Sequence, residues 1–222
     1  MRLRPVIPVT SKVVPAVLAG FLLAGCGGSI SPGAAAVVDG TTISMDQADR
    51  AAVVFCQVSL FSSAQAGGST VDNADVRRQA VAELVSGVVA DEVAKREGIT
   101  ISPSDYEFTR AQRDQVAQAL PDVDLDEAVR VLEAGQRTYA IAEQLGVAET
   151  GEQVTPQNEG DVQQAGRAVL ADAVEAADVH IDPRFGLGDD GRQVAATGSL
   201  SVSSDVLNED APPIAPATQR CS

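Results

Sequence analysis

The chain contains one histidine, His180, the side chain best suited to proton transfer near neutral pH. It lies between Val179 and Ile181, and alternation along a strand would place it on the face opposite these neighbours. No Gly-x-Ser-x-Gly nucleophile motif occurs to pair with it. A proton shuttle is one interpretation. We favour the other, a solvent-facing or structurally hydrogen-bonded strand residue, and expect neither a catalytic residue nor an enzyme.

A second candidate is a group of carboxylates, Asp122, Asp124 and Asp126, followed by Glu133. Their spacing matches part of a calcium-binding loop, with Glu133 at its twelfth position. The sixth position of such a loop requires glycine for a sharp turn, and Glu127 stands there instead. Carboxylates at the start of a helix also interact with its free N–H groups and the positive end of its dipole. We therefore expect helix capping here, with no metal and no cofactor.

The amino-acid composition argues against nucleic acid as a binding partner. The 222 residues carry a formal net charge of −15, and only 3% are aromatic, with no Trp. A phosphate backbone would be repelled, and single-stranded nucleic acid is normally bound by stacking on aromatic side chains, so we expect no nucleic-acid partner. The segment Gly67-Gly68-Ser69 is not followed by the Lys-Ser or Lys-Thr of a phosphate-binding loop. We interpret it as a connecting loop.

Residues 1–25 have the organisation of a secretion signal. Arg2, Arg4 and Lys12 precede an apolar run at 13–24, and the segment holds no acidic residue. The run is shorter than the roughly 20 residues that span a bilayer. Its removal leaves 13 basic and 31 acidic side chains, a formal charge of −18.

The apolar run ends in Leu23-Ala24-Gly25-Cys26, which resembles a bacterial lipobox. The resemblance implies attachment of a diacylglyceryl group to the Cys26 thiol and cleavage before that residue. Several acyl chains give stable anchoring, whereas one gives marginal anchoring. We therefore predict a lipoprotein at the extracytoplasmic face of the cell membrane. The alternatives are an ordinary secretory signal with a coincidental cysteine, or a buried helix.

Two cysteines remain after such processing, Cys56 and Cys221. Compartments outside the cytoplasmic membrane permit disulfides, so we predict a bond between them that pins the Pro-rich C-terminal tail to the first helix. The alternative is a buried Cys56 and an exposed, frayed Cys221. Residues 26–35, rich in Gly, Ser and Ala, are predicted to be a flexible tether.

Between tether and tail, hydrophobic periodicity and capping residues predict five helices, at 44–63, 72–97, 103–120, 124–146 and 155–176. Short extended segments are predicted at 36–43, around an Asp39-Gly40 turn, and at 179–181. The second helix has an unusually wide apolar stripe, formed by Val76, Ala80, Val81, Leu84, Val85, Val88, Val89 and Val93. The apolar face of the fourth is formed by Ala128, Leu132, Gly135, Tyr139, Ala142 and Leu145.

Three segments resemble, in order, the N-terminal domain of SurA- and PrsA-type extracytoplasmic foldases. They are AVVDGTTIS at 36–44, EVAKREGITISPSD at 92–105 and VHIDPRFG at 179–186. The resemblance implies a helical chaperone domain over 36–186 whose terminal strands pair to close it, followed by a polar, Pro-rich tail at 187–222. Many members also carry a parvulin prolyl isomerase domain. Only about 30 residues separate Gly146 from Val179 here, roughly a third of what that domain needs.

We therefore expect a mainly α fold of about five helices, with a small β pairing between the N-terminal and C-terminal segments. The expected function is that of a membrane-anchored holdase for unfolded secreted or envelope polypeptides, without isomerase activity. The alternative is a lipoprotein adaptor or envelope assembly factor that uses the same domain for one partner. Promiscuous binding leaves no motif, so the sequence names no client-contact residue.

Overall fold

The computed structural model describes residues 32–68, 70–194 and 220–221. The predicted signal peptide, Cys26 and most of the predicted tail lie outside these residues. The helices are α1 (Met45–Gln65), α2 (Asn73–Glu97), α3 (Arg110–Ala119), α4 (Leu125–Thr150) and α5 (Glu159–Ala176). The strands are β1 (Ala34–Val38), β2 (Thr41–Ser44) and β3 (Val179–Ile181), and two single 3-10 turns are η1 (Pro103–Asp105) and η2 (Pro183–Phe185).

Strands β1 and β2 form the predicted hairpin. Its two turn residues, Asp39 and Gly40, both have positive φ, 46° and 83°. These are the signs that a two-residue turn of type I′ requires. The first strand begins at Ala34, within the segment predicted as tether, because Ala34 pairs with Ser44 and both Ala34 and Ala35 are buried. The tether prediction was therefore two residues too long.

Strand β3 returns to β1 and completes a three-stranded antiparallel sheet of order β2-β1-β3. Val37 lies opposite His180, and Asp182 N–H donates to Ala35 O at 2.9 Å just beyond the last pair. The side chain of Asp39 accepts a hydrogen bond from Asp178 N–H at 3.0 Å, so the hairpin turn also holds the residue before β3. The predicted pairing of the N-terminal and C-terminal segments is confirmed.

Helices α1 and α2 begin at the predicted caps. Ser44 accepts from Gln47 N–H at 3.1 Å, and Gln47 accepts in return from Ser44 N–H, which makes a capping box. Asp72 caps α2 by accepting from Ala74 N–H at 2.7 Å. No capping box is present at this helix start, and the Asp75 carboxylate pairs with Arg78.

The predicted third helix, 103–120, was too long. Ser102 and Pro103 begin only the single turn η1, and the chain then leaves helical geometry at Tyr106, where φ is −136°. The helix restarts after Thr109, which forms its own capping box with Gln112. The second cap, Thr109, therefore divides the segment 103–120 into a single turn and a helix, although its hydrophobic pattern is continuous. The predicted fifth helix also began too early: Thr155 N–H donates to Asn158 Oδ1 in a turn, and α5 starts at Glu159.

The fourth helix continues past Gly146, the predicted end, to Thr150 and is closed by Gly151 at φ 70°. Gly146 instead allows α5 to approach closely: a Cβ there would lie 2.0 Å from Val162 O. Gly166 on α5 is the counterpart, because its Cβ would lie 1.7 Å from Ala142 O. Glycine serves this crossing by lacking a side chain, whereas the sequence pattern suggested a stop signal.

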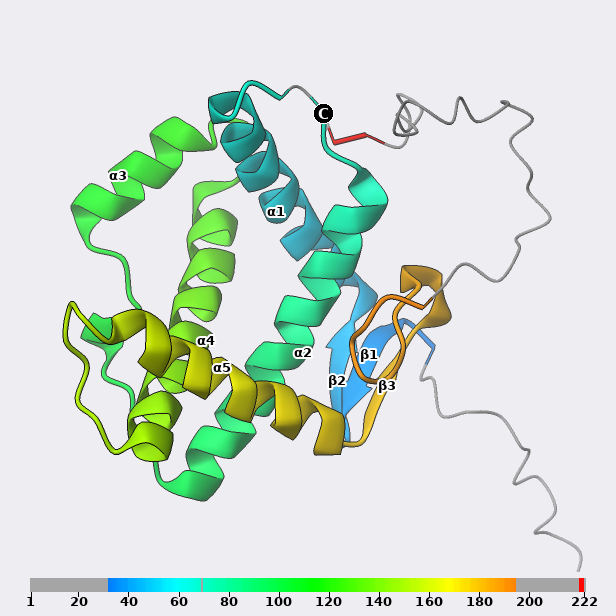
Figure 1. Cartoon of the computed structure of the whole chain (residues 1–222). Coiled ribbons are helices and arrows are strands. Elements are labelled where there is room, and N and C mark those ends of the chain that lie inside the picture. Colours follow the sequence, from blue (N-terminus) through cyan, green and yellow to red (C-terminus); the bar gives the residue numbers. More distant parts are fainter. Residues whose placement is uncertain (1–31, 69, 195–219, 222) are drawn as a thin grey trace, which may run out of the picture.

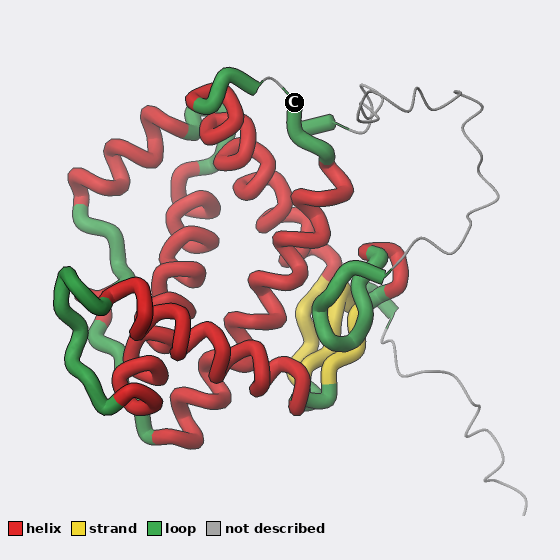
Figure 2. Tube along the Cα trace, in the orientation of Figure 1, coloured by secondary structure: helices red, strands yellow, loops and turns green. Residues whose placement is uncertain are grey.

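Figure 1 shows α2 at the centre of the arrangement, with α1 and α4 to one side of it, α5 crossing near its middle and the sheet on its other side. Figure 2 shows that the strands gather in that one region and that the remainder is helical. The main core joins sheet, α2, α4 and α5 through residues such as Val38, Val85, Ile141 and Ile181. The expected fold class, mainly α with a small sheet, is confirmed.

Candidate functional site

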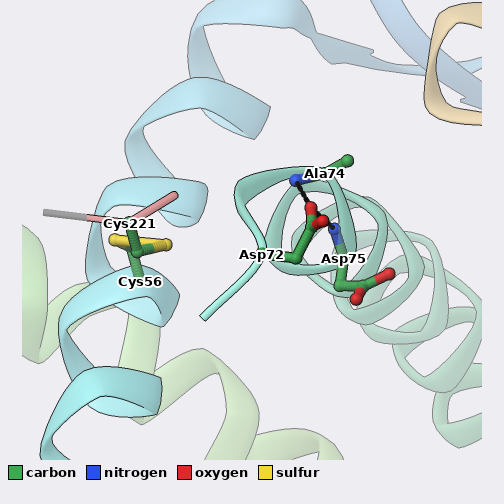
Figure 3. Close-up of a disulfide and its surroundings, with 5 residues drawn as sticks. All are labelled: Cys56, Asp72, Ala74, Asp75 and Cys221. Atoms are coloured by element: carbon green, nitrogen blue, oxygen red, sulfur yellow. Dashed lines mark hydrogen bonds between the residues drawn. A yellow bond between two sulfur atoms is a disulfide. The ribbon is translucent and has the colours of Figure 1, made fainter. Parts of the chain in front are cut away.

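The structure brings Cys56 and Cys221 to disulfide distance, with their Cα atoms 5.6 Å apart (Figure 3). Cys56 lies in the second half of α1, and Cys221 is largely buried. Two backbone contacts hold the same end of the chain: Cys221 N–H donates to Val71 O at 3.0 Å, and Arg220 forms a β-bridge with Asp72. Asp72 is also the cap of α2. The C-terminal residues are thereby seated between α1 and the start of α2.

His180 lies at the surface of the sheet, with its side chain 40% exposed. Its Nε2 is 3.4 Å from Asp178 and its Nδ1 is 3.6 Å from Asp189. The structure therefore gives this side chain two carboxylate neighbours on the rim of the domain. That arrangement suits a structural contact between β3 and the turn at 189–191, and it faces no nucleophile among these contacts.

The acidic group at 122–133 is divided among separate tasks. Asp124 accepts from Glu127 N–H at 2.9 Å and caps α4, while Asp126 pairs with Arg113 at 2.9 Å. Glu133 accepts from Phe108 N–H at 2.8 Å and fixes the loop before α3. Within residues 32–68, 70–194 and 220–221, no group of three or more His, Cys, Asp or Glu side chains could hold a metal ion.

The best candidate for a binding site is a groove between α1, α2 and α4, which we call the three-helix groove. Its volume is about 220 Å³. It is lined by Ala51 and Phe55 from α1, by Glu83, Leu84, Gly87, Val88 and Asp91 from α2, and by Val131, Ala134, Gly135, Arg137 and Thr138 from α4.

Each helix contributes residues three or four positions apart, which is the spacing of one helix face. Phe55, Leu84, Val88 and Val131 form the apolar walls and are only half buried. Small residues, among them Gly87 and Gly135, leave the space between these walls unfilled. The groove is therefore an apolar surface that the fold itself does not cover.

Charged groups lie on the rim of the groove. Asp91 and Arg137 form an ion pair at 2.7 Å that links α2 to α4, and the Arg137 guanidinium also lies 5.5 Å from the centre of the Tyr106 ring. Glu83 is the remaining ionisable lining residue. Desolvation by the surrounding protein raises the pKa of its carboxyl above the usual value.

A larger hollow, about 290 Å³, lies beside Cys56 and Cys221, but its character is different. Asp49, Asn73 and Arg77 give it a polar lining. Arg77 pairs with Asp49 at 2.8 Å and its guanidinium lies 5.6 Å from the centre of the Phe185 ring, so its charge already has partners within the fold. This hollow offers less apolar surface than the three-helix groove, and we do not treat it as the site.

Comparison with family models, with curated proteins and with solved structures found no significant match. Among the described residues, no helix is both long enough and apolar enough to span a bilayer.

The sequence pattern contained the groove residues without identifying them. Leu84 and Val88 belong to the wide stripe of α2, and Gly135 belongs to the apolar face of α4. The apolar stripe of α2 is wider than a single core contact requires, and this width was the sequence signal for an additional apolar surface. Tyr139 was expected on the same apolar face as Gly135, but it is half exposed, and its hydroxyl accepts from Arg167 at 3.0 Å.

Proposed function

We propose that this chain is a membrane-anchored extracytoplasmic lipoprotein that acts as a holdase for unfolded secreted or envelope polypeptides, without prolyl isomerase activity. The observation that carries the proposal is the three-helix groove, whose apolar walls from three helices remain half exposed around an unfilled space of about 220 Å³. An apolar surface that the fold leaves open is typical of sites that contact other polypeptides.

The size of the groove favours side chains of a polypeptide over a small molecule. Pockets for drug-sized ligands usually have volumes of roughly 300–1,000 Å³ and several convergent polar groups. The three-helix groove has about 220 Å³, and its ion pair is satisfied internally. It has room for one or two apolar side chains of an extended or helical segment, which suits brief and unspecific contact.

The N-terminal sequence supports the location. Its basic start, apolar run and Leu23-Ala24-Gly25-Cys26 ending resemble a lipobox, and the anchor would hold the domain close to newly exported chains. The resemblance of segments 36–44, 92–105 and 179–186 to the foldase N-terminal domain supports the chaperone assignment.

The proposal is tested by suppression of aggregation of a reduced, denatured reporter protein. The informative variant is Gly135→Leu, because a Cβ at this groove position meets no atom within 4 Å and the side chain has room to fill the groove. The matched control is Gly160→Leu in the first turn of α5, also with no atom within 4 Å and away from the groove.

The wild-type domain and Gly160→Leu are expected to suppress aggregation at molar excess, and Gly135→Leu is expected to lose most of the effect. Wild-type protein without any effect would contradict the holdase, and equal activity of all three would contradict the groove as its site. Circular dichroism of both variants checks that the helices remain folded.

The anchor is tested separately with labelled fatty acid in cells. We expect label on the wild-type chain and none on Cys26→Ala, together with release of that variant from the membrane fraction. Unlabelled wild-type protein would contradict the lipoprotein assignment and leave the groove argument intact.

A further inference from the structure

Glu83 occupies an exceptional position in the three-helix groove. It precedes Leu84 on α2, and both side chains line the groove. Asp91 and Arg137, the other charged lining residues, pair with each other at 2.7 Å. Glu83 has no hydrogen-bond or ion-pair partner among the residues that the structure describes.

The charges of the lining therefore do not cancel. The pair of Asp91 and Arg137 contributes one charge of each sign, and α1 contributes only Ala51 and Phe55. An ionised Glu83 leaves the groove with a single negative charge beside its apolar walls. The whole chain, with a formal charge of −15, adds to the negative potential around it.

The surroundings of Glu83 disfavour its charged form. Although its side chain reaches solvent, desolvation raises the pKa of the carboxyl. An incoming cation would offset this cost, because an opposite charge within about 4–6 Å favours the ionised form.

A groove with apolar walls and one unpaired carboxylate fits a ligand with the same two features. A large apolar side chain would contact Phe55, Leu84 and Val131, and a cation close to it would reach Glu83. Lysine and arginine combine a charge with an apolar stem, so they can lie along such a wall.

We propose that Glu83 gives the groove a preference for segments of unfolded polypeptide in which a lysine or arginine lies within a few residues of a large apolar side chain. This inference rests on the proposed function, because it names the class of segment that the same groove binds. An acidic residue at that place in the client would be repelled. Glu83 would therefore favour segments with a basic residue there and disfavour segments with an acidic one.

The test uses three short fluorescent peptides that differ at one position. Each contains a single Phe in a Gly- and Ser-rich context, with Lys, Gln or Glu two residues away. Binding is measured by anisotropy at low ionic strength for wild-type protein, Glu83→Gln, Glu83→Lys and Glu149→Gln. Glu149 is an exposed residue at the end of α4, outside the groove, and serves as the control.

We expect wild-type protein and Glu149→Gln to bind the Lys peptide about three- to tenfold more tightly than the Gln peptide, and the Glu peptide most weakly. Glu83→Gln should lose most of this preference and keep only the small part that comes from the negative charge of the whole chain. Glu83→Lys should prefer the Glu peptide. Gly135→Leu should lose affinity for all three peptides.

An unchanged Lys preference in Glu83→Gln, or an equal loss in Glu149→Gln, would overturn the inference. Equal affinity of the groove for all three peptides would overturn the charge preference but would not contradict the holdase function. Wild-type protein that binds no peptide and suppresses no aggregation would overturn both. Self-association of the wild type that Gly135→Leu abolishes would assign the groove to a second copy of the chain and also overturn the inference.

Discussion

At the scale of single residues, Asp182 has a structural task that depends on its charge. Its carboxylate is largely buried and accepts from the Arg184 backbone N–H at 2.9 Å and from the Arg184 guanidinium at 2.6 Å. These hydrogen bonds lower the pKa of Asp182. They fix the turn η2 directly after β3, where Phe185 packs into the core.

Replacement of Asp182 by Asn keeps a side chain that can cap the turn but removes the charge. We expect Asp182→Asn to lower the free energy of unfolding by about 0.5–1 kcal/mol at pH 7, a modest value because Arg184 is largely exposed. A lowered pKa contributes stability above the unfolded value, near 3.9, and that contribution is lost as the pH falls through the folded value.

Urea unfolding of both proteins between pH 7 and pH 2.5 checks this prediction. The difference in the free energy of unfolding between wild type and Asp182→Asn should shrink toward zero as the pH approaches 2.5. The matched control is Asp190→Asn, which changes a more exposed carboxylate that accepts from Arg192 N–H in a similar turn. A difference that stays constant with pH, or a larger loss in the control, would contradict the role given to the charge.

At the scale of the elements, Gly135 and Gly146 of α4 have opposite surroundings. Gly135 faces the open groove, whereas Gly146 lies against α5 with no room for a Cβ. Substitution by alanine should therefore change the free energy of unfolding in opposite directions at these two positions.

We expect Gly135→Ala to raise the free energy of unfolding by about 0.5–1 kcal/mol, because alanine is the better helix former and meets no neighbour. Gly146→Ala should lower it by about 1–3 kcal/mol, because the added methyl group would force α4 and α5 apart. Chemical denaturation of the two variants beside wild type measures both signs. Stabilisation by Gly146→Ala would contradict the close crossing.

The sequence predicted those features of the helices and turns that depend on neighbouring residues along the chain. The caps Ser44, Asp72 and Asp124 and the Asp39-Gly40 turn act through neighbours a few residues away, so their positions followed from local pattern. Gly146 could not be assigned in this way, because its role depends on Val162, a residue of another helix. The groove is missing from the pattern for the same reason: it exists only where three helices meet.

At the scale of the whole molecule, the two ends of the described chain are held to the helical body in different ways. Strand β1 pairs with β3 and connects the segment after residue 33 to the segment before residue 182. The pair Cys56 and Cys221 holds the C-terminal residues against α1, with Cys221 N–H bonded to Val71 O. In an oxidising compartment, a bond between these sulfurs restricts the unfolded chain more than the folded one.

We expect protein from an oxidising compartment to contain no free thiol at Cys56 or Cys221, and mass analysis of unreduced proteolytic fragments to find them joined. Cys56→Ser, Cys221→Ser and the double variant should each lose about 2–4 kcal/mol of stability relative to wild type. The double variant should lose no more than either single variant. Free thiols in the isolated wild-type protein would contradict the bond.

The proposed holdase function requires that the three-helix groove receive many different unfolded chains outside the cytoplasmic membrane. The most direct measurement places a photoreactive side chain at position 135 or, as control, at position 160, and irradiates intact cells. We predict crosslinks from position 135 to many unrelated exported polypeptides, and few from position 160. A single captured protein from position 135 would indicate an adaptor, and equal capture from both positions would contradict the groove as the site of binding.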